Sequence, residues 1–120
     1  MLVQSVFGDV AAKAQKKQRG YSSQAWREAE YYLGICDMNN KQYEAALRHF
    51  YKCDELSRTL DKDEASGFMV MANLKAGMAN DALGRRDLAE KQYRKVLDMK
   101  EYLDSHKQAE EYLEKPYPSF

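Results

Sequence analysis

The chain has 120 residues with nineteen basic and nineteen acidic side chains, so its formal net charge is zero. This length fits one compact domain. The balanced charge provides no overall positive field that would hold a phosphate backbone. We therefore expect a single domain that does not bind nucleic acid.

Apolar stretches are short throughout the chain. No segment approaches the ~18 continuous apolar residues of a membrane helix. Residues 1–10 lack the basic lead-in and the unbroken apolar core of a signal peptide. We expect no membrane association and a cytoplasmic location.

The composition favours helices along the whole chain. Prolines occur only at Pro116 and Pro118, and the other residues are rich in Ala, Leu, Glu, Lys, Arg, Gln and Met. Apolar residues spaced three and four apart predict a first helix from about Leu2 to Gln18. Its apolar face consists of Val3, Val6, Phe7 and Val10.

Two longer helices follow. The second is expected at 22–38, where Ser22 or Ser23 can accept hydrogen bonds from the free amides of the first turn. The third is expected at 43–60, because its apolar residues keep a helical spacing without a break.

The fourth helix is expected at 63–83, with Asp61 or Asp63 as its cap. Asn and Gly, which tolerate the left-handed backbone that ends a helix, follow the second and fourth helices. These breaks are Asn39-Asn40-Lys41 and Leu83-Gly84-Arg85. Because the breaks are short, we expect antiparallel neighbours.

The last two helices are shorter. The fifth is expected at 88–102 from its apolar spacing. The sixth follows Ser105, whose hydroxyl can cap it while Gln108 reaches back, and it ends before Pro116, which cannot continue a helix.

One interval recurs along the chain. Phe7, Phe50 and Tyr93 stand 43 residues apart, and Gly34 and Gly77 keep the same step. Further positions in this register are Val10, Cys53 and Val96, together with Ala46 and Ala89. A fixed period of this size indicates an array of helical hairpins that bury one another's apolar faces.

These residues resemble the tetratricopeptide repeat family. The first copy of the motif is Leu33-Gly34, Tyr43, Ala46-x3-Phe50-x2-Cys53, and the second is Gly77, Gly84, Ala89-x3-Tyr93-x2-Val96. The glycine and the alanine would let two helices approach closely, and the aromatic would fill the space between hairpins.

The chain departs from this family at several positions. Its period is 43 residues rather than about 34. Glu30 and Asn73 replace the early Trp, Asp37 and Asn80 replace the mid-helix Tyr, and the closing Pro is missing. A HEAT-like array, whose period is close to 43, remains the structural alternative.

The resemblance implies an all-α fold: a right-handed α-solenoid of antiparallel helical hairpins with about six helices. The expected organisation begins at 1–19 with a helix of the kind that comes second in a hairpin, here without a first helix to pair with. Repeats at 22–60 and 63–102, a capping helix at 105–115 and a loose tail at 116–120 follow.

The family binds partner proteins or peptides in a concave groove lined by the first helices of its hairpins. Carried over to this chain, the groove would contain Tyr31, Tyr32, Ile35, Met38, Met71, Leu74, Lys75 and Met78, with Glu28, Asn39, Asp81 and Ala82 also on this face. Tyr31 and Ile35 stand where a carboxylate-clamp member of the family has Lys and Asn, so capture of chaperone tails is not expected. A groove of this composition suits an apolar or amphipathic helix.

Self-association is the alternative function. The first helix has no preceding partner, so its apolar residues Val3, Val6, Phe7 and Val10 could join two copies in a homodimer. The chain could also be the last part of a longer array.

Catalysis and metal binding are not expected. Cys36 and Cys53 occupy positions where the other repeat has small apolar residues, so we interpret them as buried hydrophobes. His49 has no orienting third group that would make it a catalytic base. Asp61-x-Asp63 opens like a calcium loop but lacks the required Gly, so we expect no metal and no cofactor.

Overall fold

The computed structural model of this protein describes residues 2–16, 22–62 and 64–117, without the side chains of residues 2–5. Within these residues the chain forms six α-helices and no strand, so the all-α prediction is confirmed. The helices are α1 (Leu2–Gln15), α2 (Ser23–Asn39), α3 (Tyr43–Leu60), α4 (Gly67–Ala82), α5 (Arg86–Leu97) and α6 (Ser105–Glu114).

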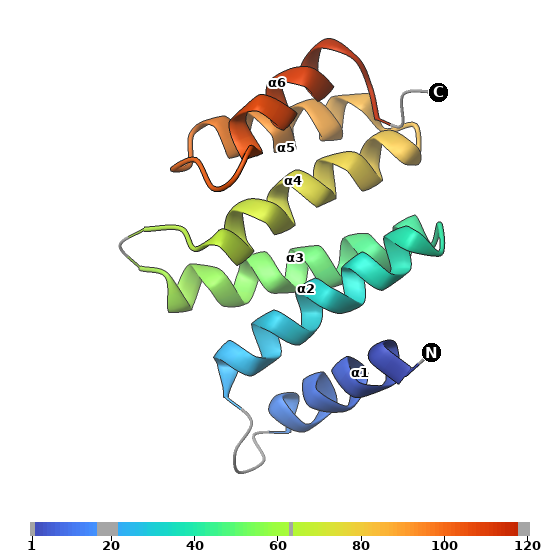
Figure 1. Cartoon of the computed structure of the whole chain (residues 1–120), viewed down its shortest axis with the longest axis vertical. Helices are drawn as coiled ribbons and strands as arrows, with labels where there is room; N and C mark the ends of the chain where they lie inside the picture. Colours follow the sequence, from blue (N-terminus) through green and yellow to red (C-terminus); the bar gives the residue numbers. More distant parts are fainter. Residues whose placement is uncertain (1, 17–21, 63, 118–120) are drawn as a thin grey trace.

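The helices are stacked in chain order along the longest axis of the molecule (Figure 1). Each helix packs on the next one, as the short connections predict. In addition, α2 contacts α4 and α4 contacts α6, so these three helices lie along one face. No helix of the described residues is both long enough and apolar enough to span a bilayer.

The two turns α2–α3 and α4–α5 have the same construction. Lys41 and Gly84, which stand 43 residues apart, both have left-handed backbone, with φ of 59° and 78°. The amide of Gln42 donates a hydrogen bond to the carbonyl of Asp37 at 2.7 Å. In the same way, the amide of Arg85 donates to the carbonyl of Asn80 at 2.8 Å. This six-to-one hydrogen bond defines the Schellman helix end.

The predicted glycine and aromatic positions also meet in both repeats. A Cβ atom added to Gly34 would lie 2.5 Å from a ring carbon of Phe50, and one added to Gly77 would lie 2.5 Å from a ring carbon of Tyr93. Both rings are completely buried. The 43-residue interval is therefore confirmed at these positions, since each glycine admits the aromatic ring of the following helix.

Helix α1 lies on α2. Phe7 and Val10 pack against a cluster that contains residues of α1 and α2, and the Phe7 ring stacks on Tyr32 at 5.0 Å. Val6 is 58% exposed, and the side chain of Val3 lies outside the described residues. The apolar face expected to need another chain is thus covered in part by α2.

Helix α4 begins four residues later than predicted. Its cap is Ser66, whose hydroxyl accepts a hydrogen bond from the amide of Met69 at 3.2 Å. The prediction of Asp61 was wrong because that carboxylate accepts from the amide of Ser66 and pairs with Arg27. Asp63 lies outside the described residues.

Other helix ends differ less. The Ser22 cap of α2 is confirmed by a hydrogen bond from the amide of Ala25 to its hydroxyl. Helix α5 ends at Leu97 rather than at 102. Ser105 does not cap α6, because its hydroxyl instead accepts from the amide of Tyr102 at 3.0 Å and Asp104 is the cap residue.

Polar residues at the positions where the repeat family has Trp and Tyr form contacts between helices. His49 Nδ1 lies 2.6 Å from a carboxylate oxygen of Glu30, and His49 Nε2 lies 3.4 Å from one of Asp37. In the next repeat, the side-chain amide of Asn73 donates to Asp54 at 2.8 Å. Glu30, Asp37 and Asn73 are thus buried polar residues with partners on a neighbouring helix.

The end of the chain is tied to α4 through Asp81. Its Oδ2 atom accepts from Arg86 at 2.9 Å, from the Tyr93 hydroxyl at 2.7 Å and from the amide of Tyr117 at 3.1 Å. Arg86 also donates to the carbonyl of Leu113. Burial and the hydrogen bond to Asp81 raise the pKa of Tyr93. The tail expected to be loose is therefore anchored at Tyr117, and residues 118–120 lie outside the described residues.

Candidate partner-binding site

A hollow of about 570 Å³ lies where α2, the start of α4 and the α5–α6 connection meet. Its volume falls in the range of sites that hold a ligand or a partner side chain. We call it the aromatic pocket; its lining residues are Arg27, Tyr31, Tyr32, Ser66, Gly67, Phe68, Met71, Tyr102 and Leu103.

Large apolar side chains reach solvent at the rim of this pocket. Tyr32 is 39% exposed, Tyr102 is 45% exposed and Leu103 is 72% exposed. They come from two segments that lie far apart in the sequence. Apolar residues gathered around a hollow are characteristic of an interaction surface, whereas apolar residues scattered singly need no explanation.

Edge-to-face contacts hold the pocket's rings together. The ring centroids of Tyr31 and Tyr32 lie 5.2 Å apart, and that of Phe68 lies 5.6 Å from Tyr31 and 6.2 Å from Tyr32. These separations and near-perpendicular planes are favourable for aromatic pairs. Burial raises the pKa of Tyr31 to about 12, so its hydroxyl stays protonated at neutral pH. The rings form a preorganised apolar wall.

An ion pair supports this wall. Arg27 Nη1 donates to both carboxylate oxygens of Asp61, at 2.7 and 2.8 Å, and to the Ser66 hydroxyl at 3.2 Å. The guanidinium also lies 5.5 Å from the Phe68 ring centroid. Burial alone would raise the pKa of Asp61, but the hydrogen bonds from Ser66 and Arg27 outweigh it and lower the pKa.

The α5–α6 connection completes the rim in a strained conformation. Tyr102 lies on the first residue of α4, since a Cβ atom at Gly67 would come within 2.5 Å of its ring. Leu103 has left-handed backbone with φ of 54°. That conformation costs an ordinary residue about 1 kcal/mol. Left-handed backbone also occurs in ordinary turns, as at Lys41, but here it places an exposed apolar side chain at the rim of the pocket.

The structure divides the eight predicted groove residues into three groups. Tyr31, Tyr32 and Met71 line the aromatic pocket. Ile35, Met38 and Lys75 are partly exposed on α2 and α4. Leu74 and Met78 are buried, because α5 and α6 pack against them.

The residues added by the structure are Arg27, Ser66, Gly67, Phe68, Tyr102 and Leu103. Phe68 follows the start of α4, which the sequence placed too early. Tyr102 was expected to be the last residue of the fifth helix, and Leu103 the residue after that helix. The sequence signal that could have found them is the pair of adjacent large apolar residues after the last residue of the α5 apolar stripe.

Asp81 and Lys75, the two charged residues of α4 that were expected on the groove face, lie in different environments. Asp81 is buried by the contacts described above and is not at the edge of a groove. Lys75 is partly buried, and this burial lowers its pKa.

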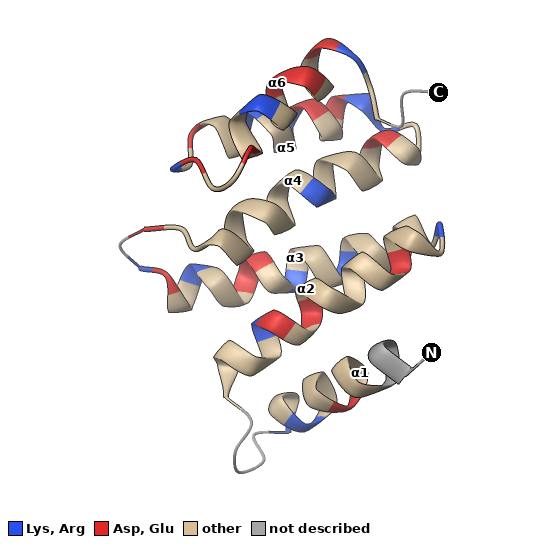
Figure 2. Ribbon diagram, viewed as in Figure 1, with Lys and Arg blue, Asp and Glu red and all other residues tan. Residues whose placement is uncertain are grey.

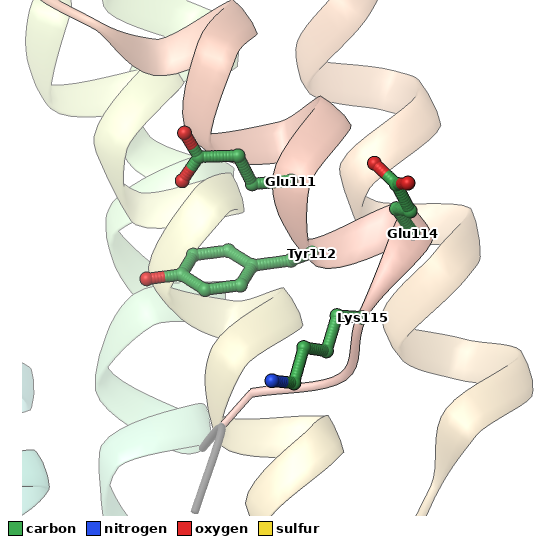
Figure 3. A pocket seen from close by; sticks show the side chains of 4 residues that line it. All are labelled: Glu111, Tyr112, Glu114 and Lys115. Carbon is green, nitrogen blue, oxygen red and sulfur yellow. The ribbon is translucent and has the colours of Figure 1, made fainter.

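A second hollow, of about 540 Å³, lies at the end of α6. All its lining residues come from this one helix end, and three of the four are exposed. Figure 3 shows that Glu111, Tyr112 and Lys115 extend to one side while Glu114 lies on the other. Because this hollow is formed by a single, mostly exposed helix end, we regard the aromatic pocket as the better candidate.

The cysteine and histidine side chains, which could act in catalysis or bind a metal, take part in contacts within the fold. Burial raises the pKa of the Cys53 thiol to about 12, which keeps it protonated and unreactive. His49 lies between two carboxylates, and His106 Nε2 lies 2.7 Å from the Met99 carbonyl. Among the described residues, no cluster of three or more His, Cys, Asp or Glu could hold a metal ion.

A scan against protein-family models and searches of curated proteins and of solved structures returned no match to this chain.

Proposed function

We propose that this chain is a non-catalytic scaffold for protein–protein interactions, built as a right-handed α-solenoid of the tetratricopeptide type. It acts without a cofactor, in the cytoplasm, by binding a peptide or a helix of a partner protein on the face formed by α2 and α4. The aromatic pocket accepts a bulky apolar side chain of that partner.

The repeated construction of the two hairpins supports the solenoid. Gly34 and Gly77 make equivalent contacts with aromatic rings, and Lys41 and Gly84 make equivalent turns. The contacts of α2 with α4 and of α4 with α6 match the inner row of helices that such an array has.

The pocket rim is the observation that carries the binding proposal. Tyr32, Tyr102 and Leu103 expose apolar surface around a hollow instead of closing it. Tyr provides contact area at low entropic cost, and Met71 beside it can adapt its shape. An amphipathic helix that inserts one large apolar side chain fits this surface.

The test uses a random peptide library displayed on phage and selected on the immobilised chain. Peptides that bind are synthesised, and their affinities are measured by fluorescence polarisation. Leu103→Asn and Tyr32→Ser should each weaken binding by roughly tenfold or more, because each removes apolar contact area.

The matched control is Leu88→Ser, since Leu88 on α5 is 47% exposed and does not line the pocket. It should leave the affinity unchanged. The proposal fails if selection yields no binder, or if the affinities of the selected peptides are indifferent to both pocket variants.

Self-association through α1 is a second candidate, favoured by the exposure of Val6. Val6→Asp is a cleaner test than Phe7→Asp, because Phe7 also packs on α2. Light scattering should then show a dimer that this variant dissociates. A monomer at high concentration of the unmodified chain would exclude the dimer.

A further inference from the structure

Helix α4 carries a lysine, Lys75, with which no carboxylate of the described residues forms an ion pair. Its only charged residues are Lys75 and Asp81, and Figure 2 shows a basic band in the middle of this otherwise largely uncharged helix. Asp81 is fully used by Arg86, Tyr93 and Tyr117. Among the described residues, no carboxylate oxygen lies within 4.0 Å of the Lys75 ammonium group.

This isolation contrasts with the other cations near the helix interfaces. Arg27 pairs with Asp61, Arg58 with Asp54 and Arg86 with Asp81. Partial burial of Lys75 lowers its pKa. A partly desolvated charge without a partner is unfavourable in the free protein, so an incoming anion would gain a favourable contact.

Lys75 also lies beside the aromatic pocket. Met71 lines the pocket, and Lys75 follows it by one turn on the same side of α4, about 6 Å along the helix axis. Across from this row, Met38 of α2 packs against the cluster that contains Leu74. The cation therefore stands next to apolar surface and close to the site of the proposed anchor.

We propose that Lys75 pairs with an Asp or Glu carboxylate of the bound partner, one helical turn away from the apolar side chain that fills the aromatic pocket. This inference rests on the proposed function and specifies the partner: an acidic amphipathic segment. In a helical partner the anchor and the acid are three or four residues apart.

A carboxylate fits this position better than a phosphorylated residue does. Phosphate recognition in proteins uses clusters of arginines or several donors. Here Arg27, the nearest arginine in the pocket, is already occupied by both oxygens of Asp61. A single lysine supplies one positive charge, which matches one carboxylate.

The test compares peptides selected from one phage-displayed random library on three forms of the chain: unmodified, Lys75→Met and Lys75→Glu. Peptides from the unmodified chain should share an apolar residue with Asp or Glu three or four positions away. Lys75→Met should retain the apolar residue and lose the acid. Lys75→Glu should select Lys or Arg in its place.

Affinities provide the second measurement. A peptide selected on the unmodified chain should bind Lys75→Met roughly tenfold more weakly, as expected for a lost hydrogen bond to a charged group, and the loss should shrink in high salt. Lys91→Met, which removes an exposed lysine of α5, should not change the affinity. Circular dichroism verifies that each variant is folded.

Two failures are distinguishable. If selected peptides depend on Tyr32 and Leu103 but show no acidic preference and bind Lys75→Met normally, the role of Lys75 is refuted while the pocket stands. If their binding is indifferent to Tyr32 and Leu103 as well, the proposed function fails and this inference fails with it.

Discussion

Gly34 lies so close to the ring of Phe50 that a Cβ atom at this position would stand 2.5 Å from a ring carbon. The ring is completely buried. Gly34→Ala should therefore destabilise the fold by about 1 to 3 kcal/mol, the usual cost of overpacking. Urea unfolding measures the change.

Gly8 provides the matched control for this substitution. It lies inside α1, and a Cβ atom there would meet nothing within 4 Å. Gly8→Ala should stabilise the chain by about 0.5 to 1 kcal/mol through helix propensity. Equal effects of the two substitutions would contradict the close packing of Gly34 on Phe50.

Lys41 occupies the position that Gly84 occupies one repeat later, and both have positive φ. A residue with a Cβ atom is strained in this conformation, so Lys41→Gly should raise the free energy of unfolding by up to about 1 kcal/mol. Gly84→Ala should lower it by a similar amount. Thermal unfolding of both variants checks this pair; a loss of stability in Lys41→Gly would speak against a shared turn geometry.

Replacing Leu103 should change the stability of the fold and the affinity for a peptide in opposite directions. Asn tolerates left-handed backbone better than Leu does. Because the Leu103 side chain is 72% exposed, Leu103→Asn removes little packing and should stabilise the fold by about 0.5 kcal/mol while weakening peptide binding. A variant that loses stability and keeps its affinity would show that Leu103 is held there for packing alone.

Asp61 predicts how stability depends on pH. Its pKa is lowered in the folded state from the ordinary value of 3.8, so the folded state favours the ionised carboxylate. This contribution is complete above about pH 4 to 5 and is lost as the pH falls below 3.8 through the folded-state pKa. Asp61→Asn should cost roughly 2 kcal/mol at pH 7, because Arg27 loses a charged partner.

The difference in stability between Asp61→Asn and the unmodified chain should therefore narrow as the pH falls through the lowered folded-state pKa of Asp61, since the unmodified chain then loses the carboxylate charge as well. Glu64→Gln is the control, because Glu64 pairs with Lys100 at the exposed surface. Its effect should be much smaller and should show little dependence on pH, because both side chains of this pair are exposed to solvent. A pH-independent difference for Asp61→Asn would contradict the Arg27 pairing.

Apolar spacing predicted the order of the helices, and the interval of 43 residues predicted two equivalent packing positions. Phe50 and Tyr93 could be matched from the sequence because their glycines recur at the same distance from them. Phe7 is only partly equivalent: its ring stacks on Tyr32 of the following helix, whereas the rings of Phe50 and Tyr93 each pack on a glycine of the preceding helix.

The start of α4 could not be predicted, because it depends on a partner far away in the sequence. Asp61 has the local features of a cap, but Arg27, 34 residues earlier, binds its carboxylate and leaves the capping position to Ser66. The sequence contains no local sign of that pairing.

The lining of the site was predicted only in part for a related reason. Leu74 and Lys75 are adjacent on α4, and the resemblance to the repeat family placed both in the groove. Packing by α5 and α6 buries Leu74 completely and leaves Lys75 partly exposed. Tyr102 and Leu103 reach the pocket because α5 ends at Leu97 and the connection folds over Gly67.

The most direct measurement of the central claim is an NMR titration of the isotopically labelled chain with a peptide selected on it. Binding in the aromatic pocket should shift the amide signals of Tyr32, Met71 and Leu103 and the methyl signals of Met71 and Leu103. The signals of Leu88 on α5 should stay in place. Shifts confined to α5, or to Val6 on α1, would place the partner elsewhere and contradict the proposed binding face.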